Sequence, residues 1–255
     1  MFSITLKFLE AVKRNNSTEW LHAHRDLYQQ EKKRFSQFVE AFLVEAKSMH
    51  PILEDLQVKD CIYRFNRDLR FSKDGKPYKE NFGAIFAYWG KKSDFPCFYF
   101  HLEPGASFLG GGVYMPTSSS ESNVRKHLLR NYHRREKLSW APTFSKFYRL
   151  WDTPHHYKTT WKLKQLIKTD PKLLSELSPA LKKYCLLDEA NPSQSPRSSS
   201  SSEQVLKQVA YFKDWIFEHS LSDAELCEQE LLWKFVEAYR LILPLLEFLE
   251  EAYSL

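Results

Sequence analysis

The segment from Ile62 to Lys79 carries positive charge at a regular spacing. Each cation follows the last by three residues, and the series is Arg64, Arg67, Arg70, Lys73, Lys76 and Lys79. An arginine presents a planar fork of donors that fits a phosphate or a carboxylate in two parallel hydrogen bonds. We therefore expect an anion-binding site in which Arg64, Arg70 and Lys79 hold the anion. The other residues expected there are Arg67 and Asp68, which orient the clamps, and Lys73, which closes over the same place.

The spacing of these cations fits a strand better than a helix. On a helix each step of three residues drifts about 60° around the axis, and Gly75 and Pro77 would end the helix. From 60 to 71 apolar and polar residues alternate instead, which predicts a strand with Arg64 and Arg70 on its polar side.

Arg67 is the exception in this predicted strand, because it falls among the apolar side chains. A buried guanidinium without a partner costs several kcal/mol. We expect a carboxylate or a ligand anion to meet Arg67, or a bulge near Asn66 to turn it outward.

Three further strands are predicted at 81–89, 95–103 and 107–114, with turn residues between them. Their short connections favour antiparallel neighbours. In the second run, His101 and Glu103 face the same way, so the carboxylate can orient the imidazole as a general base. Gly111, in the middle of three glycines, would let a ligand approach backbone N–H groups closely. These residues complete a predicted pocket on the polar face of the sheet.

The same residues also have a purely structural interpretation. A cross-strand salt-bridge network can join the sheet to a helix, with the glycines marking a bulge; its members would be Arg64, Asp68, Arg70 and Glu103. The sequence is therefore compatible with a small-molecule binding protein, with an enzyme, and with a structural or partner-binding protein.

Helices are predicted before these strands. An apolar stripe marks a first helix that ends at Asn15 and Asn16, and Asn16 with Glu19 has the spacing of a capping box. The following stretch, 18–48, keeps one apolar face and is predicted to be helical with one break near Gln30.

Helices are predicted after the strands as well. Ser118 and Glu121 repeat the capping spacing and open a basic helix that contains Arg125. Ser222 and Glu225 form another such pair before the C-terminal apolar helices. Pro244 is expected to kink or split that last run.

The composition of the 255-residue chain fits a folded protein with a full core, since 15% of the residues are aromatic against only 7 glycines. No run approaches the roughly 18 apolar residues of a membrane span, and the first ten residues lack the apolar run of a signal peptide. We expect a cytoplasmic protein without a membrane partner. The predicted fold is α+β, a curved and mainly antiparallel sheet over about 60–115 packed by N-terminal helices and a helical C-terminal third. A single domain over 1–255 is expected, with a flexible Ser-rich loop at 191–202.

The net charge of +5 is unevenly distributed. Residues 203–255 hold 11 acidic and 4 basic residues, a net of −7, which leaves +12 for residues 1–202. Such a field favours anionic partners in general. A nucleic-acid-binding module is therefore an alternative function, with the aromatic and basic stretch 140–151 as its stacking surface.

Neither a metal nor a particular cofactor is indicated. The cysteines are scattered without a C-x-x-C pair, and they are Cys61, Cys97, Cys185 and Cys227. His22 and His24 lie two residues apart in a predicted helix and so point to different sides. No glycine-rich phosphate-binding fingerprint is present.

The run R-F-N-R-D-L-R-F-S-K-D-G-K-P-Y-K (64–79) is similar to the signature of an uncharacterised family, domain-of-unknown-function family 2461. The opening N-N-S-T-E-W-L (15–21) resembles its Asn-Asn and Glu-Trp-Phe start, and G-G-G-V-Y-M-P (110–116) resembles its glycine-rich strand. Arg125 falls where the family's helix places an arginine. The resemblance covers roughly residues 2–190 well and the acidic C-terminus loosely.

Two positions depart from the family's pattern: Leu21 replaces the usual phenylalanine, and Gly75 stands where lysine is common. The resemblance supports the fold and the location of the site, with Arg125 as a further member. It implies no reaction, because fold and family alone do not specify chemistry.

Overall fold

The computed structural model describes residues 1–68, 70, 75–131, 149–150 and 215–253. The chain divides into two compact units, one made of residues 1–111 and 218–243 and the other of residues 112–217 and 244–255. The organisation as a single domain stays a prediction. Lys73, the Ser-rich stretch 191–202 and most of the aromatic and basic stretch 140–151 lie outside the described residues.

Three helices open the first unit, α1 (Ser3–Arg14), α2 (Thr18–Ala23) and α3 (Arg25–Met49). The first ends at Asn15, as predicted. The break in the second helical stretch lies at His24, not near Gln30, and α3 then continues to Met49.

Asn16 has a different role from the predicted cap. The N-cap of α2 is Ser17, whose hydroxyl accepts the Trp20 N–H at 3.2 Å. Asn16 instead makes two hydrogen bonds to the backbone of Tyr78, since its Nδ2 donates to the carbonyl at 3.0 Å and its Oδ1 accepts the N–H at 3.1 Å. This pair of bonds ties the segment around Tyr78 to the N-terminal helices.

The strands form an open sheet with the order β1-β2-β3-β5-β4. They are β1 (Phe82–Phe86), β2 (Cys97–Leu102), β3 (Ser107–Val113), the two-residue β4 (Arg149–Leu150) and β5 (Trp215–Leu221). β1 and β2 are antiparallel, with Gly83 opposite His101 and Ile85 opposite Tyr99. The α+β class and the mainly antiparallel sheet are confirmed, and each of the three predicted runs contains one of the first three strands.

The strand predicted from 60 to 71 is wrong. Short described helices lie around this region, namely η1 (Pro51–Leu53), α4 (Val58–Cys61) and, after β1, η3 (Gly90–Lys92). After α4 the described residues 62–68 make two isolated bridges, from Ile62 to Ala84 and from Asn66 to Tyr78. These described residues belong to a loop, because no continuous ladder joins them to a neighbouring strand.

The two-residue alternation predicted for this segment fails for the same reason. Alternation predicts Tyr63 and Phe65 on one side, opposite Arg64, yet their rings meet opposite faces of the sheet. The Tyr63 ring lies 6.1 Å from that of Tyr99, and the Phe65 ring lies 5.3 Å from that of Phe82. Since no ladder holds the segment, spacing along it does not fix which side chains lie together.

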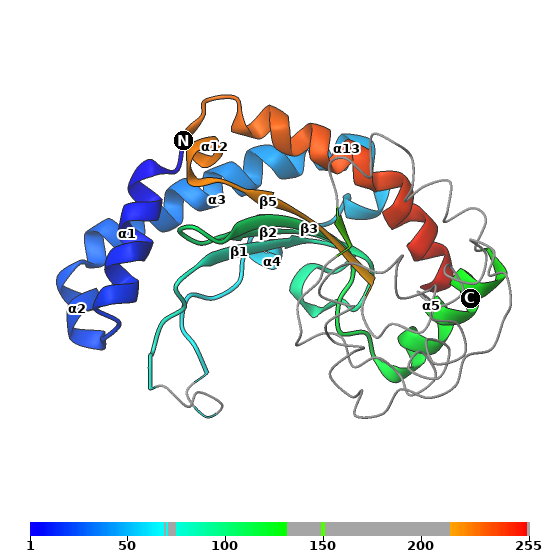
Figure 1. The fold of residues 1–255 in the computed structure, drawn as a ribbon, viewed down its shortest axis with the longest axis horizontal. Coiled ribbons are helices and arrows are strands. Elements are labelled where there is room, and N and C mark those ends of the chain that lie inside the picture. The colour runs from blue at the N-terminus through cyan, green and yellow to red at the C-terminus, as the bar shows by residue number, and fades with distance from the viewer. Residues whose placement is uncertain (69, 71–74, 132–148, 151–214, 254–255) are drawn as a thin grey trace, which may run out of the picture. The chain divides into compact units, whose positions relative to one another are not determined.

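One face of the sheet carries the aromatic core. The Phe100 ring of β2 lies 5.6 Å from Phe35 of α3 and 4.6 Å from Phe235 of α13 (Leu231–Glu250). Figure 1 shows α3 along this face, while the described residues 62–68 and 75–81, in cyan, extend from the opposite side of the sheet. The helices therefore leave the other face of β1 and β2 for different contacts.

The C-terminal helices follow β5. In α12 (Asp223–Cys227) Ser222 and Glu225 form a reciprocal capping box, which confirms the prediction. α13 passes through Pro244 without ending, so of the predicted kink or split the split does not occur and the kink stays a prediction, and η4 (Glu251–Tyr253) follows it. Among the described helices, α13 included, none is both long enough and apolar enough to cross a membrane.

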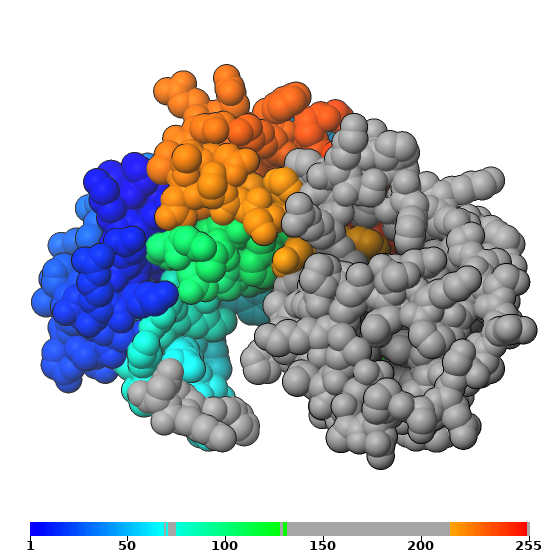
Figure 2. All heavy atoms as spheres, viewed as in Figure 1, coloured from blue at the N-terminus to red at the C-terminus, as the bar shows by residue number. Residues whose placement is uncertain are grey.

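The turn between β2 and β3 reaches the surface of the first unit. Figure 2 shows it between the N-terminal helices in blue and the α12 segment in orange. The backbone N–H of Gly105 in this turn donates to the Asp223 carboxylate at 3.0 Å. The turn is thereby fixed to α12, which holds the ends of both strands.

In the second unit the main described element is α5 (Ser118–Arg130). Its N-cap is Thr117, whose hydroxyl accepts the Ser120 N–H at 3.3 Å, one residue before the predicted position. The His127 ring of α5 lies 4.5 Å from Phe248.

Candidate functional site

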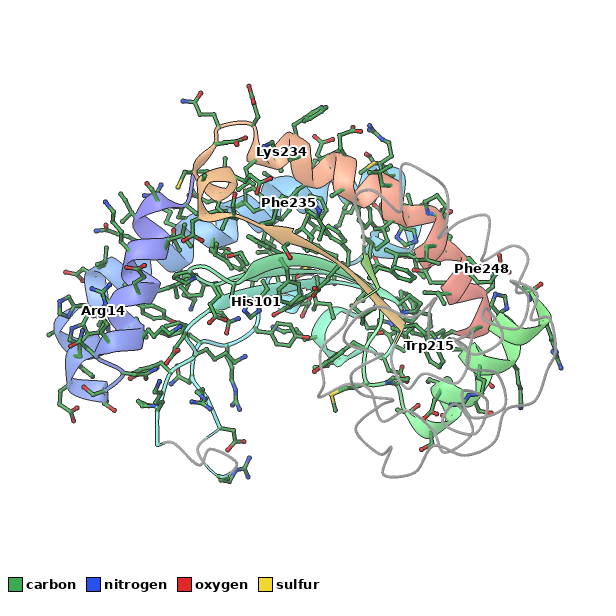
Figure 3. All side chains as sticks on the ribbon, viewed as in Figure 1. Arg14, His101, Trp215, Lys234, Phe235 and Phe248 are labelled. Atoms are coloured by element: carbon green, nitrogen blue, oxygen red, sulfur yellow. The ribbon has the colours of Figure 1, made fainter. Side chains whose placement is uncertain are left out.

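An open cavity of about 540 Å³ lies in the first unit, on the face of the sheet opposite α3. Its lining side chains are Arg64, Asn66, Arg67, Asp68, Lys79, Asn81, Tyr99 and His101. Each of these ends in a polar group. With three cations against one carboxylate, positive charge dominates the lining. Figure 3 places His101 on this face of the sheet, opposite Phe235.

Backbone hydrogen bonds close residues 62–81 into a loop with two arms. The Arg67 N–H donates to the Pro77 carbonyl at 2.9 Å, and the Lys79 N–H donates to the Phe65 carbonyl at 2.9 Å. Arg67 and Lys79 therefore come from opposite arms into one cavity. Loop closure, not alternation along a strand, places these two cations together.

The base of this loop is fixed to the sheet. The Tyr63 N–H donates to the Gly83 carbonyl of β1 at 3.0 Å. The Lys91 ammonium, from η3, donates to the carbonyls of Lys59 and Ile62 at 2.6 and 2.7 Å. Together with the Asn16 bonds to Tyr78, these contacts anchor both arms.

Lys79 is a half-buried cation in this cavity. Its Nζ lies 5.2 Å from the centre of the Tyr63 ring, a cation–π contact. Burial lowers the pKa of Lys79, and the Arg64 charge lowers it further. Within the part of the chain that the structure describes, no carboxylate lies within ion-pair distance of this ammonium. A negative charge placed beside Lys79 would favour its protonated form, and so would counteract the effects of burial and of the Arg64 charge on its pKa.

Among the described residues Asp68 is the only carboxylate that lines the cavity, and Arg70, which is not part of the lining, binds it. Arg70 Nε and NH2 donate to the two carboxylate oxygens at 2.9 and 2.7 Å. This hydrogen-bonded arginine lowers the pKa of Asp68. Arg64 lies farther from the same carboxylate, at 3.7 Å, and its side chain is 70% exposed. Arg70 therefore neutralises much of the negative charge that faces Arg64.

The sheet contributes Tyr99 and His101 from β2 to the cavity. The Tyr99 ring crosses over Gly83 of β1, where an added Cβ would lie 2.6 Å from the tyrosine oxygen. Glycine at position 83 thus provides the space in which the Tyr99 hydroxyl reaches His101 Nδ1, at 3.1 Å. A side chain on β1 would displace this hydroxyl.

His101 is held on three sides. Its Nε2 lies 2.8 Å from the Glu103 carboxylate, and its Nδ1 lies 3.1 Å from the Tyr99 hydroxyl and 3.4 Å from Asn81 Nδ2. Its ring stacks on Phe108 with centroids 4.9 Å apart and planes at 13°. The hydrogen bond from His101 lowers the pKa of Glu103, so this carboxyl is ionised at neutral pH. The imidazole is therefore fixed in position and in orientation.

Glu103 is itself positioned by the turn that follows β2. Its N–H donates to the buried Ser107 hydroxyl at 2.9 Å, and that hydroxyl donates to the Glu103 carbonyl at 2.7 Å. These two hydrogen bonds fix the backbone from which the Glu103 carboxylate extends. Among the described residues it hydrogen-bonds His101 and pairs with neither Arg64 nor Arg70, so the single salt-bridge network of the structural interpretation is divided into two separate clusters.

The structure brings several of the predicted site residues together. Those that line the cavity are Arg64, Arg67, Asp68, Lys79 and His101, and Glu103 contacts His101 from behind. The sequence did not predict Asn81 or Tyr99 as site residues. The signal for Asn81 was its place two residues before Gly83, which pairs with His101 across the two strands.

Other predicted residues lie elsewhere. The Arg70 side chain is 81% exposed and is not part of the lining. Gly111 approaches α13: an added Cβ would lie 2.2 Å from the end of the Ile242 side chain, so close packing accounts for this glycine. Arg125 belongs to the second unit and forms an ion pair with Glu121. Lys73 lies outside the described residues.

The cysteines of the first unit do not add a nucleophile to the cavity. Burial raises the pKa of the Cys61 and Cys97 thiols to about 12 in each case, and neither lines the cavity. Cys227 is exposed and free. Within the described ranges, no three His, Cys, Asp or Glu side chains come together in a way that would hold a metal ion.

The fold and the cavity define an α+β protein with a polar, cation-lined site on the open face of its sheet. The chain belongs to the family described as conserved hypothetical protein (DUF2461), whose model matches residues 4–248. This match confirms the resemblance and includes the whole cavity. No curated protein and no solved structure matches the chain.

Proposed function

We propose that this protein binds a small molecule through an anionic group, a phosphate or a carboxylate, held by Arg64, Arg67 and Lys79. The observation that carries the proposal is the half-buried Lys79 ammonium, which faces a second cation in an open cavity without a carboxylate of its own among the described residues.

The physical argument starts from the cost of that arrangement. Two cations that share a partly desolvated cavity repel each other, and burial disfavours the charge of Lys79. A bound anion offsets both penalties and forms charge-assisted hydrogen bonds worth roughly 1.5–3 kcal/mol each. The free protein therefore holds a site that an anion stabilises.

The arrangement of Asp68 supports the same conclusion. If the arginines served only to balance carboxylates, Asp68 would be expected to pair closely with the cation inside the cavity. It pairs more closely with the exposed Arg70, at 2.7 Å, than with Arg64, at 3.7 Å. Arg64 is thus the more loosely paired of the two arginines, which favours a bound anion as its further partner.

The test is a binding titration with inorganic phosphate and with acetate at low ionic strength, where screening is weakest. Arg64→Ala and Lys79→Met are each expected to weaken phosphate binding about tenfold or more, the equivalent of one charge-assisted bond. Arg14→Ala is the matched control, because Arg14 is a similarly exposed arginine (75%) that pairs with Glu10 on α1.

Two results would count against the proposal. Absence of binding by either anion to the wild-type protein would reject it, and so would equal weakening by Arg14→Ala, which would reduce the effect to net charge. A short RNA is included as a competitor, since binding that falls steeply with salt and ignores Arg64→Ala would favour the nucleic-acid alternative.

A further inference from the structure

The hydrogen bonds around His101 specify where its protons lie. Glu103 is ionised and can only accept, so the 2.8 Å contact requires a proton on His101 Nε2. In the neutral imidazole the other nitrogen, Nδ1, then carries the lone pair. Glu103 therefore selects the tautomer whose basic nitrogen faces the cavity side.

The Tyr99 hydroxyl is the group placed to donate to that nitrogen. It lies 3.1 Å from Nδ1, closer than Asn81 Nδ2 at 3.4 Å. Tyr99 and His101 both line the cavity, whereas Glu103 is outside the lining and contacts the imidazole at Nε2. The order of the contacts, starting at the tyrosine, is thus hydroxyl, imidazole, carboxylate.

Two further features suit this series to proton transfer. The Phe108 ring covers one face of the imidazole, which limits its motion and its access to water. The charged groups on the other lining elements are Arg64, Arg67, Lys79 and Asp68, so an anion held by the cations lies in the same cavity as the Tyr99 hydroxyl.

We propose that Tyr99, His101 and Glu103 form a proton relay that acts on an O–H group of the anionic molecule bound in the cavity. The inference rests on the proposed function, because the cations must hold that molecule. Tyr99 is the catalytic residue that meets the substrate, His101 accepts the proton through it, and Glu103 is a positioning residue.

The transfer is balanced without any other reactant. The substrate O–H bond breaks and its electron pair stays on the substrate oxygen, while the proton bonds to the Tyr99 oxygen. The Tyr99 proton moves in turn to His101 Nδ1. The resulting imidazolium is stabilised by Glu103, and the reverse transfer returns the proton at the end of the cycle. The substrate class is a small phosphate or carboxylate compound that carries a hydroxyl group.

The experiment is nitrogen NMR of the ¹⁵N-labelled protein titrated with inorganic phosphate. In the free wild-type protein His101 is expected as the Nε2–H tautomer. Phosphate is expected to shift two signals together, the Arg64 Nε signal that reports binding and the His101 Nδ1 signal that reports the relay.

Variants separate the relay from simple binding. Tyr99→Phe should abolish the Nδ1 response and keep the Arg64 response, whereas Tyr88→Phe, the matched tyrosine change outside the cavity lining, should keep both. Glu103→Ala should lose the single tautomer, and Glu103→Gln should retain it, because the glutamine oxygen still accepts from Nε2.

The outcomes distinguish the two proposals. A proton on Nδ1 in the free wild-type protein overturns the relay, and so does an Nδ1 response that survives in Tyr99→Phe. If phosphate shifts Arg64 but not His101, anion binding stands and the relay fails. If phosphate shifts neither signal, the anion site itself is rejected, and the relay loses its substrate with it.

Discussion

The two faces of β1 and β2 differ in what they contribute to the protein. On one face the rings of Phe98 and Phe100 are fully buried against α3 and α13. On the other face Gly83, Tyr99 and His101 form the wall of an open polar cavity. Figure 3 shows the contrast, with Phe235 above the sheet and His101 below it.

This difference follows from the period of a strand. Because successive side chains point to opposite faces, one six-residue strand supplies apolar rings for burial and polar groups for a site. The aromatic face provides the free energy of folding that lets the other face keep half-buried polar groups. The comparison predicts that substitutions on the two faces separate stability from ligand binding.

The largest expected effect is on the aromatic face. Phe100→Ala should lower the free energy of unfolding by about 3–5 kcal/mol, because it leaves a cavity among Phe35, Phe38 and Phe235. Tyr99→Phe, one residue earlier, should cost far less, since only a hydroxyl is removed. Urea unfolding of both variants measures the difference. Equal losses would contradict a division of roles between the faces.

The parts of the fold that follow local periodicity could be predicted from the sequence. The three strands 82–86, 97–102 and 107–113 lie inside the predicted runs, and the shared side of Tyr99, His101 and Glu103 follows directly from their spacing of two. Neighbouring strands here are close in sequence. The local alternation of apolar and polar residues therefore already predicts which side chains share a face of the sheet.

The parts that depend on distant partners could not be predicted in this way. Asn16 has the local spacing of a helix cap, but its amide binds Tyr78, 62 residues later. The cations at 64 and 70 share the spacing of one strand face, yet Arg70 lies outside the cavity, because hydrogen bonds between the arms of the loop set its course. Alternation predicts a common side only where a ladder holds the strand flat.

The next effect compares two glycines, one on each face. In Gly83→Ala the new methyl group would lie 2.6 Å from the Tyr99 oxygen, and in Gly111→Ala it would lie 2.2 Å from Ile242 Cδ1. Each should cost about 1–3 kcal/mol of stability, the usual range for overpacking. Only Gly83→Ala should also remove the phosphate response of His101, because it displaces the tyrosine hydroxyl.

The same NMR titration and urea unfolding check this pair. Gly111→Ala is the control for overpacking, since its added methyl group crowds Ile242 of α13 and leaves the cavity unchanged. A normal His101 response in Gly83→Ala would mean that the Tyr99 hydroxyl does not need the space above this glycine, and the proposed relay geometry would be wrong.

The smallest expected effect compares two lysines with opposite environments. Burial and the Arg64 charge lower the pKa of Lys79, whereas the hydrogen bond to Glu228, at 2.5 Å, raises the pKa of Lys234 on α13. A lowered lysine pKa means that the folded state holds the proton less tightly than the unfolded state. Lys79 therefore destabilises the fold at neutral pH, and Lys234 stabilises it.

Lys79→Met should accordingly raise the stability of the phosphate-free protein at pH 7, by less than about 1 kcal/mol because solvent screens a half-exposed charge. The gain should shrink as the pH rises through the lowered pKa and should vanish above the ordinary value of 10.5, where neither state keeps the proton. Lys234→Met should show the opposite sign, with a loss at pH 7 that disappears only above its raised pKa. Thermal unfolding at pH 7 and just above pH 10.5 tests both, because at the higher pH the Lys79→Met gain should be gone while part of the Lys234→Met loss remains. A loss of stability in Lys79→Met at pH 7 would assign this lysine to an ion pair that supports the fold. The Lys79 charge would then already be stabilised without a bound anion, which would contradict the argument for the anion site.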